Sequence, residues 1–346
     1  MKFEIDTKFL LDCFQEIVST PSPVGYSREL KPVLEGYARD LGLPFHYDNK
    51  NTFYMTLEGT DSSKTVMVGG HADTLGLVVR KIDTDGMIRV RALGGVNYSS
   101  LEGEFVTVHT RDGRKYTGLL TCQSHSVHVF DDARTAPRDE NTMMVILDEK
   151  VSSKEDVTAL GIRHGDVISI DPRCTVTEQG YVKSRFIDDK AGVACIFTAL
   201  KYMKAHDLQP KYRTLIAIPF LEEIGLGGTY VPEEVSEFVA VDIGLIGPDL
   251  DGTEYAVSIC AKDNAAPYDY DLTSRLIEYA EKADCDYKVD IYYHYSTDAN
   301  ASIRAGNNLK AATFGMAVYC SHGMERTHIT GLQNTVNLTL AYLLDI

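Results

Sequence analysis

The segment that most constrains this chain is an apolar run that ends in two adjacent carboxylates. Residues 215–223 read LIAIPFLEE, so seven of the nine are apolar or proline. Such a run is typical of a strand buried on both faces of a parallel sheet. Two adjacent acids at its end repel each other and resist burial unless a cation binds one of them. Taken alone, the segment favours a solvated acidic pair at a strand end, because acidic dipeptides are common.

Other acidic and histidine side chains follow further apolar runs. His71 and Asp73 come directly after one such run, and Asp242 ends another. The pair Asp188 and Asp189 lies at a predicted strand-to-helix turn. Because ligands bind beyond the carboxyl ends of the strands in open α/β sheets, we expect these groups to converge on one crevice.

The hydrophobic pattern predicts an α/β fold that is interrupted by a β-rich insertion. Helical spacing of apolar residues predicts helices at residues 6–18, 27–41, 193–203, 272–282 and 333–344. Between about residues 76 and 180, short alternating runs separated by Asp-Gly turns predict hairpins instead. We therefore expect one α/β domain formed by residues 1–76 and 180–346, with residues 77–179 inserted as a β-rich domain.

The composition narrows the range of partners. The chain has 346 residues, with 34 Lys and Arg against 50 Asp and Glu, which gives a net charge of −16. This balance argues against a nucleic-acid or anionic-membrane partner. The first residues, MKFEID, do not have the pattern of a signal peptide, so a cytoplasmic location is expected. The seven cysteines form no CxxC pair and are interpreted as reduced core residues.

A crevice that gathers six carboxylates and a histidine needs cations. Nitrogen and oxygen donors without cysteine suit zinc, with cobalt or manganese as alternatives. A two-metal site holds its ions roughly 3.5–4 Å apart and activates a water molecule as the nucleophile. Glu223 can then bind metal while Glu222 acts as the general base. Glycosidases also use two acids, but these face each other across a sugar at roughly 5–9 Å, which sequence neighbours in an extended segment do not supply.

A second histidine ligand is expected near the end of the chain. His322 and His328 both follow an apolar run, and their spacing alone favours neither. Both alternatives stay open at this point.

Together these motifs resemble the M42 family of metallo-aminopeptidases, the tetrahedral or glutamyl aminopeptidase group. The motifs that carry the resemblance are His71-x-Asp73, Asp188-Asp189, Glu222-Glu223-Ile224-Gly225, Val241-Asp242 and Glu325-Arg326-Thr327-His328. The resemblance covers nearly the whole chain. It implies a mixed-sheet di-metal peptidase domain with an inserted small β-barrel-like domain that serves oligomerisation, and a homo-oligomer, specifically a dodecamer.

The resemblance also implies a role for each site residue. The ligands of two divalent ions are His71, Asp188 and Asp242 for one ion, and Asp188, Glu223 and His328 for the other. Asp188 therefore bridges the ions, Glu222 is the base, and Asp73 orients His71. A cis peptide bond between Asp188 and Asp189 is implied as well.

Two further residues are candidates for substrate contact. Asp298 begins a predicted helix near the crevice, where it can meet a substrate α-amino group or merely cap the helix. His294 can contact substrate or have an ordinary packing role. The predicted function is a metal-dependent aminopeptidase acting on short peptides. The alternatives are an amidohydrolase or deacylase acting on N-acyl amino acids, and a non-catalytic metal-binding assembly protein, which has no use for the unligated carboxylate of Glu222.

Overall fold

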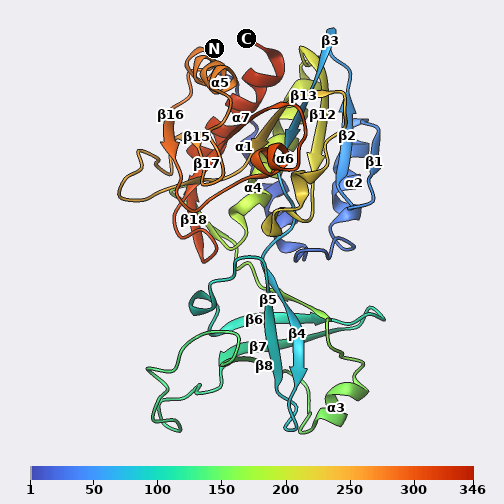
Figure 1. Ribbon diagram of the computed structural model, residues 1–346, viewed down its shortest axis with the longest axis vertical. Helices are drawn as coiled ribbons and strands as arrows, with labels where there is room; N and C mark the ends of the chain where they lie inside the picture. Colours follow the sequence, from blue (N-terminus) through green and yellow to red (C-terminus); the bar gives the residue numbers. More distant parts are fainter. Residues whose placement is uncertain (1) are drawn as a thin grey trace. The chain divides into compact units, whose positions relative to one another are not determined.

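The chain is described here by a computed structural model that covers residues 2–346 (Figure 1). Its contacts divide it into two compact units. One unit comprises Met1–Asp73 with Arg173–Ile346, and the other comprises Thr74–Pro172. No helix within residues 2–346 has both the length and the apolar character needed to span a membrane.

The larger unit is built on a mixed nine-stranded sheet. Its strands are β1 (Phe45–Tyr47), β2 (Phe53–Leu57), β3 (Asp61–Gly69), β12 (Tyr212–Ile218), β13 (Val235–Val241), β14 (Gly244–Leu245), β15 (Val257–Lys262), β16 (Tyr287–Ile291) and β17 (Lys310–Val318). The order across the sheet is β1-β2-β12-β3-β13-β17-β15-β16, and β14 pairs with β17. Strands β12, β3, β13 and β17 are mutually parallel, so their carboxyl ends share one edge.

These four strands form where the sequence is most continuously apolar. Strand β3 is buried from Thr65 onward, and β12, β13 and β17 are buried along most of their length, as expected for parallel strands that are covered on both faces. The register sets Leu215 of β12 beside Met67 of β3, and Met67 beside Phe238 of β13. The apolar run of residues 215–223 thus begins in a central strand of the sheet.

Helices pack around this sheet. They are α1 (Thr7–Ser19), α2 (Lys31–Leu41), α4 (Ile187–Ala205), α5 (Tyr270–Lys282), α6 (Asp298–Arg304) and α7 (Ile329–Leu344). Helix α4 contacts α1, α2 and α7 as well as β13 and β17, and is therefore almost fully buried. Helix α2 begins at Lys31, later than the predicted residue 27. Pro32 lies in its first turn, where its fixed φ and missing N–H favour a helix start.

A small second sheet completes the larger unit. It pairs β10 (Thr175–Val176) with β11 (Tyr181–Ser184), and β11 with β18 (Glu325–His328). This pairing explains why residues 173–179 group with the larger unit rather than with the insertion, which the sequence prediction extended to residue 179.

The inserted unit is a closed β-barrel. Its strands are β4 (Gly76–Ile82), β5 (Ile88–Leu93), β6 (Glu104–His109), β7 (Lys115–Cys122), β8 (Met143–Leu147) and β9 (Val167–Ile170). They pair in the order β4-β5-β8-β7-β6-β9, and β9 closes onto β4. The unit also contains η1 (Tyr98–Ser100) and α3 (Lys154–Ala159), which Ser153 caps. Because the barrel is closed, each of its strands pairs with a neighbour on both sides, and the barrel encloses a small apolar core. The prediction of a mixed α/β fold with an inserted β-barrel is confirmed.

Candidate active site

The carboxyl ends of the four parallel strands carry the polar side chains of the site. The residues that follow β3, β12, β13 and β17 are, respectively, His71, the Glu222–Glu223 pair of the short helix η2 (Glu222–Ile224), Asp242 and His322. Asp188 joins them from the start of α4. The same strand direction that buries the apolar residues therefore delivers these groups to one edge.

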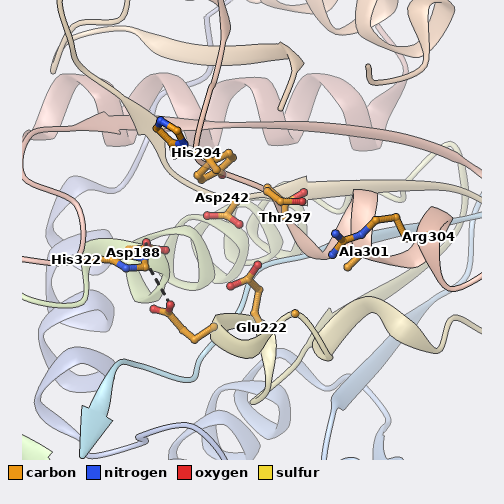
Figure 2. Close-up of a pocket in the computed structure, with 12 residues that line it drawn as sticks. Asp188, Glu222, Asp242, His294, Thr297, Ala301, Arg304 and His322 are labelled. Carbon is orange, nitrogen blue, oxygen red and sulfur yellow. Dashed lines mark ion pairs between the residues drawn. The ribbon is translucent and has the colours of Figure 1, made fainter. Parts of the chain in front are cut away.

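The centre of the cluster is formed by His71, Asp188 and Glu223. One ligand atom from each lies within 4.8 Å of the other two. His71 Nε2 is 3.0 Å from Asp188 Oδ1. His322 completes the group, because its Nε2 is 3.6 Å from Asp188 Oδ2 and 3.5 Å from Glu223 Oε2. Figure 2 shows His322 beside Asp188 and Asp242 across the same cavity.

The start of α4 is shaped to hold Asp188 and Asp189. The peptide bond between them is cis, as the resemblance implies. Asp189 is fully buried and accepts a hydrogen bond from the backbone N–H of His71 at 3.2 Å. A Cβ atom at Gly192 would collide with the Asp189 carboxylate and with the carbonyl oxygen of Val241. Glycine at position 192 therefore lets α4 approach the end of β13 closely enough to place both aspartates.

Asp73 orients the ring of His71 and also holds the turn that carries Glu222 and Glu223. His71 Nδ1 donates to the backbone carbonyl of Asp73 at 3.1 Å, which directs Nε2 toward Asp188 when the ring is neutral. The Asp73 carboxylate accepts hydrogen bonds from the backbone N–H groups of Glu222 at 3.1 Å and Glu223 at 3.2 Å. Asp73 thus fixes the turn that presents both glutamates, in addition to contacting His71.

Glu222 lies beside the cluster. Its Oε2 is 3.7 Å from His71 Nε2, and the side chain lines the cavity between Asp188 and α6. Figure 2 shows its carboxylate turned into this cavity. A group in this position can exchange a proton with a molecule bound in the cavity.

The structure does not bring His328 to the cluster, so its prediction as a metal ligand needs correction. Strand β18 runs antiparallel to β11 and carries His328 away from the edge. Its Nε2 donates to the carbonyl of Gln179 at 2.8 Å, while Nδ1 accepts from the backbone N–H of Thr330 at 3.1 Å and so caps α7. The ring also packs against Tyr181 and Tyr255. Both ring nitrogens are therefore already engaged.

His322 occupies the position that the family resemblance implied for His328, the alternative that the spacing had left open. It lies in a turn directly after β17, at the edge where the other candidate ligands lie. Glu325 fixes this turn, because its carboxylate accepts from the backbone N–H of His322 at 3.2 Å and from that of Asp188 at 3.1 Å. His322 is the first acidic or histidine residue after β17, just as His71, Glu222 and Asp242 are the first such residues after β3, β12 and β13.

No lysine or arginine among residues 2–346 forms an ion pair with Asp188, Glu222, Glu223 or Asp242. Burial and the charge of Asp188 raise the pKa of Asp242 to about 7. Burial, together with neighbouring carboxylates, raises the pKa of Glu222 and of Glu223 well above their ordinary value. Burial opposes protonation of His71, but the surrounding carboxylates raise its pKa well above its ordinary value. Carboxylate oxygens and imidazole nitrogens are usual ligands of divalent metal ions, and the negative charge of these carboxylates needs positive charge to balance it. The residues of the site therefore fit divalent metal ions.

A cavity of about 220 Å³ opens beside the cluster. Beyond the acidic residues it is lined by His294, Thr297, Ala301 and Arg304. His294 is exposed at its rim. Asp298 lies behind it, where Oδ1 accepts from the backbone N–H of Gly228 at 2.6 Å. The other carboxylate oxygen, Oδ2, is buried and has no hydrogen-bond partner among residues 2–346. The sequence did not predict Arg304 as a residue of the site, because an isolated arginine at a helix end carries no distinctive pattern.

Comparisons with known proteins identify the family of this chain and agree with its fold. The profile of the family described as M42 glutamyl aminopeptidase matches residues 51–338. The protein named "Putative aminopeptidase YhfE" of Bacillus subtilis (strain 168) is 39% identical over 334 residues, which is 96% of each chain. The TET aminopeptidase of Thaumarchaeota archaeon SCGC AB-539-E09 has a similar structure, with a TM-score of 0.88 at 16% identity, covering 99% of this chain and 97% of that chain. The Pyrococcus horikoshii TET1 peptidase, described as able to assemble into a tetrahedron or a large octahedral shell, has a TM-score of 0.86 at 22% identity, covering 97% of this chain and all of that chain. This chain therefore belongs to the M42 family of metal-dependent aminopeptidases and is a hydrolase of peptide bonds.

Proposed function

We propose that the protein removes N-terminal residues from short peptides by means of two divalent metal ions and a glutamate base. The observation that carries this proposal is the convergence of buried carboxylates and two histidines on one sheet edge, where no lysine or arginine among residues 2–346 pairs with them. A structural ion pair would place lysine or arginine among these acids. Their absence from the cluster favours ions taken from solution.

The proposed ligand sets follow the family resemblance, with His322 in place of His328, and the short distances among His71, Asp188, Glu223 and His322 support them. His71, Asp188 and Asp242 hold one ion, and Asp188, Glu223 and His322 hold the other, with Asp188 shared. Zinc is the proposed metal, with cobalt or manganese as alternatives. Bound ions supply Lewis acidity toward the carbonyl oxygen of the substrate and toward the attacking water.

Glu222 is the proposed general base. It accepts a proton from the water molecule whose oxygen forms the new bond to the carbonyl carbon. When the C–N bond breaks, Glu222 returns that proton to the leaving amine nitrogen, so the reaction is balanced. Asp73 keeps the base in place through the backbone of Glu222. The proximity of Glu222 to His71 Nε2, at 3.7 Å, supports this assignment.

Asp298 is the proposed partner of the substrate α-amino group. Its buried and unpartnered Oδ2 is an acceptor that a protonated amine would satisfy. It contributes to a narrow recess that also contains His71 and Glu222. His294, at the rim of the larger cavity, is a further proposed substrate contact. Recognition of a free amine separates an aminopeptidase from a deacylase that acts on N-acyl amino acids.

We also propose that the barrel unit mediates self-association into a dodecamer. Phe105 and Val129 of this unit are 67% and 71% exposed, so both apolar side chains are accessible for contact with another subunit. The assembly described for the Pyrococcus horikoshii TET1 peptidase supports the same proposal. The strongly negative net charge is consistent with the proposed cytoplasmic location.

The test combines metal analysis with a paired substrate panel. The protein is purified, stripped with chelator, reloaded with zinc, cobalt or manganese, and assayed on leucyl p-nitroanilide and on N-acetyl-leucyl p-nitroanilide. The proposal expects about two ions per chain and hydrolysis of the free amine only. Preference for the acetylated compound would favour a deacylase, and metal content at background would refute the two-ion site.

A further inference from the structure

One buried lysine has no part in the proposed reaction. Lys190 directly follows the Asp188–Asp189 pair, and its side chain is 1% exposed. Lysine is almost never fully buried unless it is paired, yet among residues 2–346 Lys190 forms no ion pair. Its ammonium group donates instead to two backbone carbonyls, that of Ile17 at 3.0 Å and that of Thr20 at 2.7 Å. A buried charge without an ion pair is costly, so its position needs a reason.

The simplest reason is that Lys190 caps a helix. The two carbonyls lie at the end of α1, where a positive charge is favourable in any protein. However, this helix end already has donors, because the N–H of Thr20 donates to the carbonyl of Ile17 at 3.3 Å and its hydroxyl to that of Glu16 at 2.9 Å. Lys190 also differs from an ordinary cap in its origin. It projects from α4 just after the Asp188–Asp189 pair, whose backbone is not helical.

The residues that Lys190 reaches belong to a segment that also supports the end of β3. We call residues 17–25 the supporting segment. Within it, Ser22 is fully buried, and its hydroxyl donates to the carbonyl of Ala72 at 2.6 Å. Ala72 directly follows His71, which is a proposed ligand. The supporting segment therefore contacts the chain on either side of the close pair formed by His71 and the start of α4.

The supporting segment also holds the end of β12. The N–H of Gly25 donates to the carbonyl of Phe220 at 3.2 Å, two residues before Glu222. The N–H of Ala72 donates to the carbonyl of Pro219 at 2.9 Å, so the ends of β3 and β12 are also joined directly. Three of the segments that carry site residues thus share one support.

A shared support is useful because the proposed ligands come from separate parts of the chain. His71 Nε2 is 3.0 Å from Asp188 Oδ1, although the two residues are 117 positions apart in sequence. Acidic ligands repel one another until an ion lies between them. A lysine that paired with their carboxylates would compete with the ions. Lys190 and Ser22 bind backbone carbonyls instead, which leaves the carboxylate oxygens free to bind metal.

We propose that Lys190 is a positioning residue for the metal site. It ties the Asp188–Asp189 turn to the supporting segment, and so fixes the spacing between ligands that different segments deliver. It acts through this turn and does not itself bind an ion or the substrate. The inference rests on the proposed function, since it concerns the two-ion site.

Cobalt titration measures the effect of Lys190 on the site. Lys190→Met keeps a long unbranched side chain but removes the donors. Chelator-stripped protein is titrated with cobalt(II) in competition with a chelator of known affinity, and the visible absorption bands report the ligand geometry around the ion. Cobalt affinity should fall by about 10- to 100-fold, as when an outer contact of a metal ligand is lost, and the bands should shift. Wild-type affinity together with wild-type bands would overturn the proposal, even if the variant unfolds at a lower temperature.

Lys204 offers a matched control on the same helix. It lies in the last turn of α4, where its ammonium group donates to the carbonyl of Asp40. Lys204→Met therefore removes the same kind of contact at the opposite end of α4 from Asp188. Its cobalt affinity and absorption bands should equal those of wild type. An equal loss in both lysine variants would mean that cobalt affinity follows the general stability of α4, and the positioning role would be wrong.

Ser22→Ala tests the supporting segment itself and decides the question if Lys190→Met does not fold. This variant loses the hydroxyl that donates to Ala72 but keeps both hydrogen bonds of Lys190. Cobalt affinity should fall by about fivefold, the factor that corresponds to one ordinary hydrogen bond. Unchanged affinity would show that residues 17–25 do not set the ligand spacing, which overturns the proposal.

Hydrogen exchange on metal-free protein keeps this inference separate from the proposed function. The N–H of His71 donates to Asp189 Oδ2 at 3.2 Å, so its exchange reports whether the end of β3 stays attached to the start of α4. In Lys190→Met the amides of residues 70–73 and 188–191 should exchange at least about tenfold faster than in wild type, and those of α5 less than about twofold faster. The same comparison applies to Ser22→Ala. Failure of wild type to bind cobalt would count against the proposed function alone, whereas unchanged exchange at these amides would overturn the role of Lys190.

Discussion

The two ends of strand β13 carry buried carboxylates in opposite electrostatic situations. Near its start, Glu237 Oε1 is 2.8 Å from Lys64 Nζ and 2.8 Å from Arg275 Nη2. Although burial works against the charge, these two cations hold the pKa of Glu237 below its ordinary value. After the end of the strand, burial and the charge of Asp188 raise the pKa of Asp242 to about 7. Both carboxylates are less than one-tenth exposed, so burial alone does not separate them.

The difference lies in where the compensating positive charge comes from. At the Glu237 end the chain supplies its own cations, and the resulting cluster joins β13 to its neighbours β3 and α5. At the Asp242 end, the clustered acids form ion pairs only with histidines among residues 2–346, which leaves much of the charge to be balanced by something bound. A self-compensated cluster acts in stability, whereas an uncompensated one is a candidate for binding or catalysis.

Replacing Glu222 should have the largest effect on function. Glu222→Gln keeps the size of the side chain but removes its ability to accept a proton, so kcat should fall by roughly 10²–10⁴-fold with little change in KM. Metal content should stay near that of wild type. The measurement is kcat together with elemental analysis of the same preparation.

Glu223→Gln is the matched comparison at the neighbouring position. It removes a charge from the metal cluster, so metal occupancy should fall and added metal should restore part of the activity. If Glu222→Gln loses metal as readily as Glu223→Gln, or keeps near-wild-type turnover, the roles given to the two glutamates are wrong.

Replacing the two late histidines should sharpen the contrast between a ligand and a structural histidine. His322→Ala removes a donor from Asp188 and Glu223, and should weaken metal binding by at least about tenfold. His328→Ala should leave metal affinity unchanged and should cost about 1 kcal/mol of stability, because a helix cap is lost. Metal titration and thermal unfolding of both variants check this. Equal metal affinity in His322→Ala and wild type would contradict the ligand assignment.

The sequence was sufficient where strand direction decides the outcome. A continuously apolar run followed by acids predicts a buried parallel strand, and parallel strands bring His71, Glu223 and Asp242 to one edge. The hairpins of the inserted unit were predictable for a related reason, because alternating runs joined by Asp-Gly turns favour hairpins, whereas its barrel form was implied by the family resemblance. These features depend on short stretches of chain and on one rule of sheet geometry.

The sequence was insufficient where the backbone reverses or where a residue acts alone. His328 was preferred through the resemblance, but the reversal at residues 320–323 starts an antiparallel strand that carries it away, and leaves His322 at the edge. The role of Asp73 in holding the Glu222–Glu223 turn depends on contacts across 149 and 150 positions of sequence. Arg304 has no motif, and its direction follows only from the placement of α6.

Breaking the self-compensated end of β13 should affect stability and leave catalysis intact. Glu237→Gln removes the shared anion of Lys64 and Arg275, whose side chains are 23% and 32% exposed and so stay partly solvated. The free energy of unfolding should therefore fall by about 2 kcal/mol, below the usual cost for a fully buried pair. Glu233→Gln, at an exposed glutamate just before the same strand, should change stability by less than about 0.5 kcal/mol. Urea denaturation of metal-loaded protein at pH 7 measures both, and equal stability of the two variants would contradict the role of Glu237.

The smallest expected effect is the pH dependence of the stability difference between wild type and Glu237→Gln. The pKa of Glu237 is lower in the folded protein than its ordinary value of 4.5, so the folded state binds the proton less readily than the unfolded state does. Its contribution to stability is therefore complete above pH 4.5 and is lost as the pH falls through the folded pKa. In the protonated form Glu237 resembles glutamine in size and charge. The stability difference between wild type and Glu237→Gln should hence be constant from pH 8 to about pH 6 and shrink steadily below about pH 4.5, as measured by urea denaturation across the range. A difference that persists unchanged at the lowest pH where the fold survives would mean that the shape of the glutamate, and not its charge, stabilises this end of the strand.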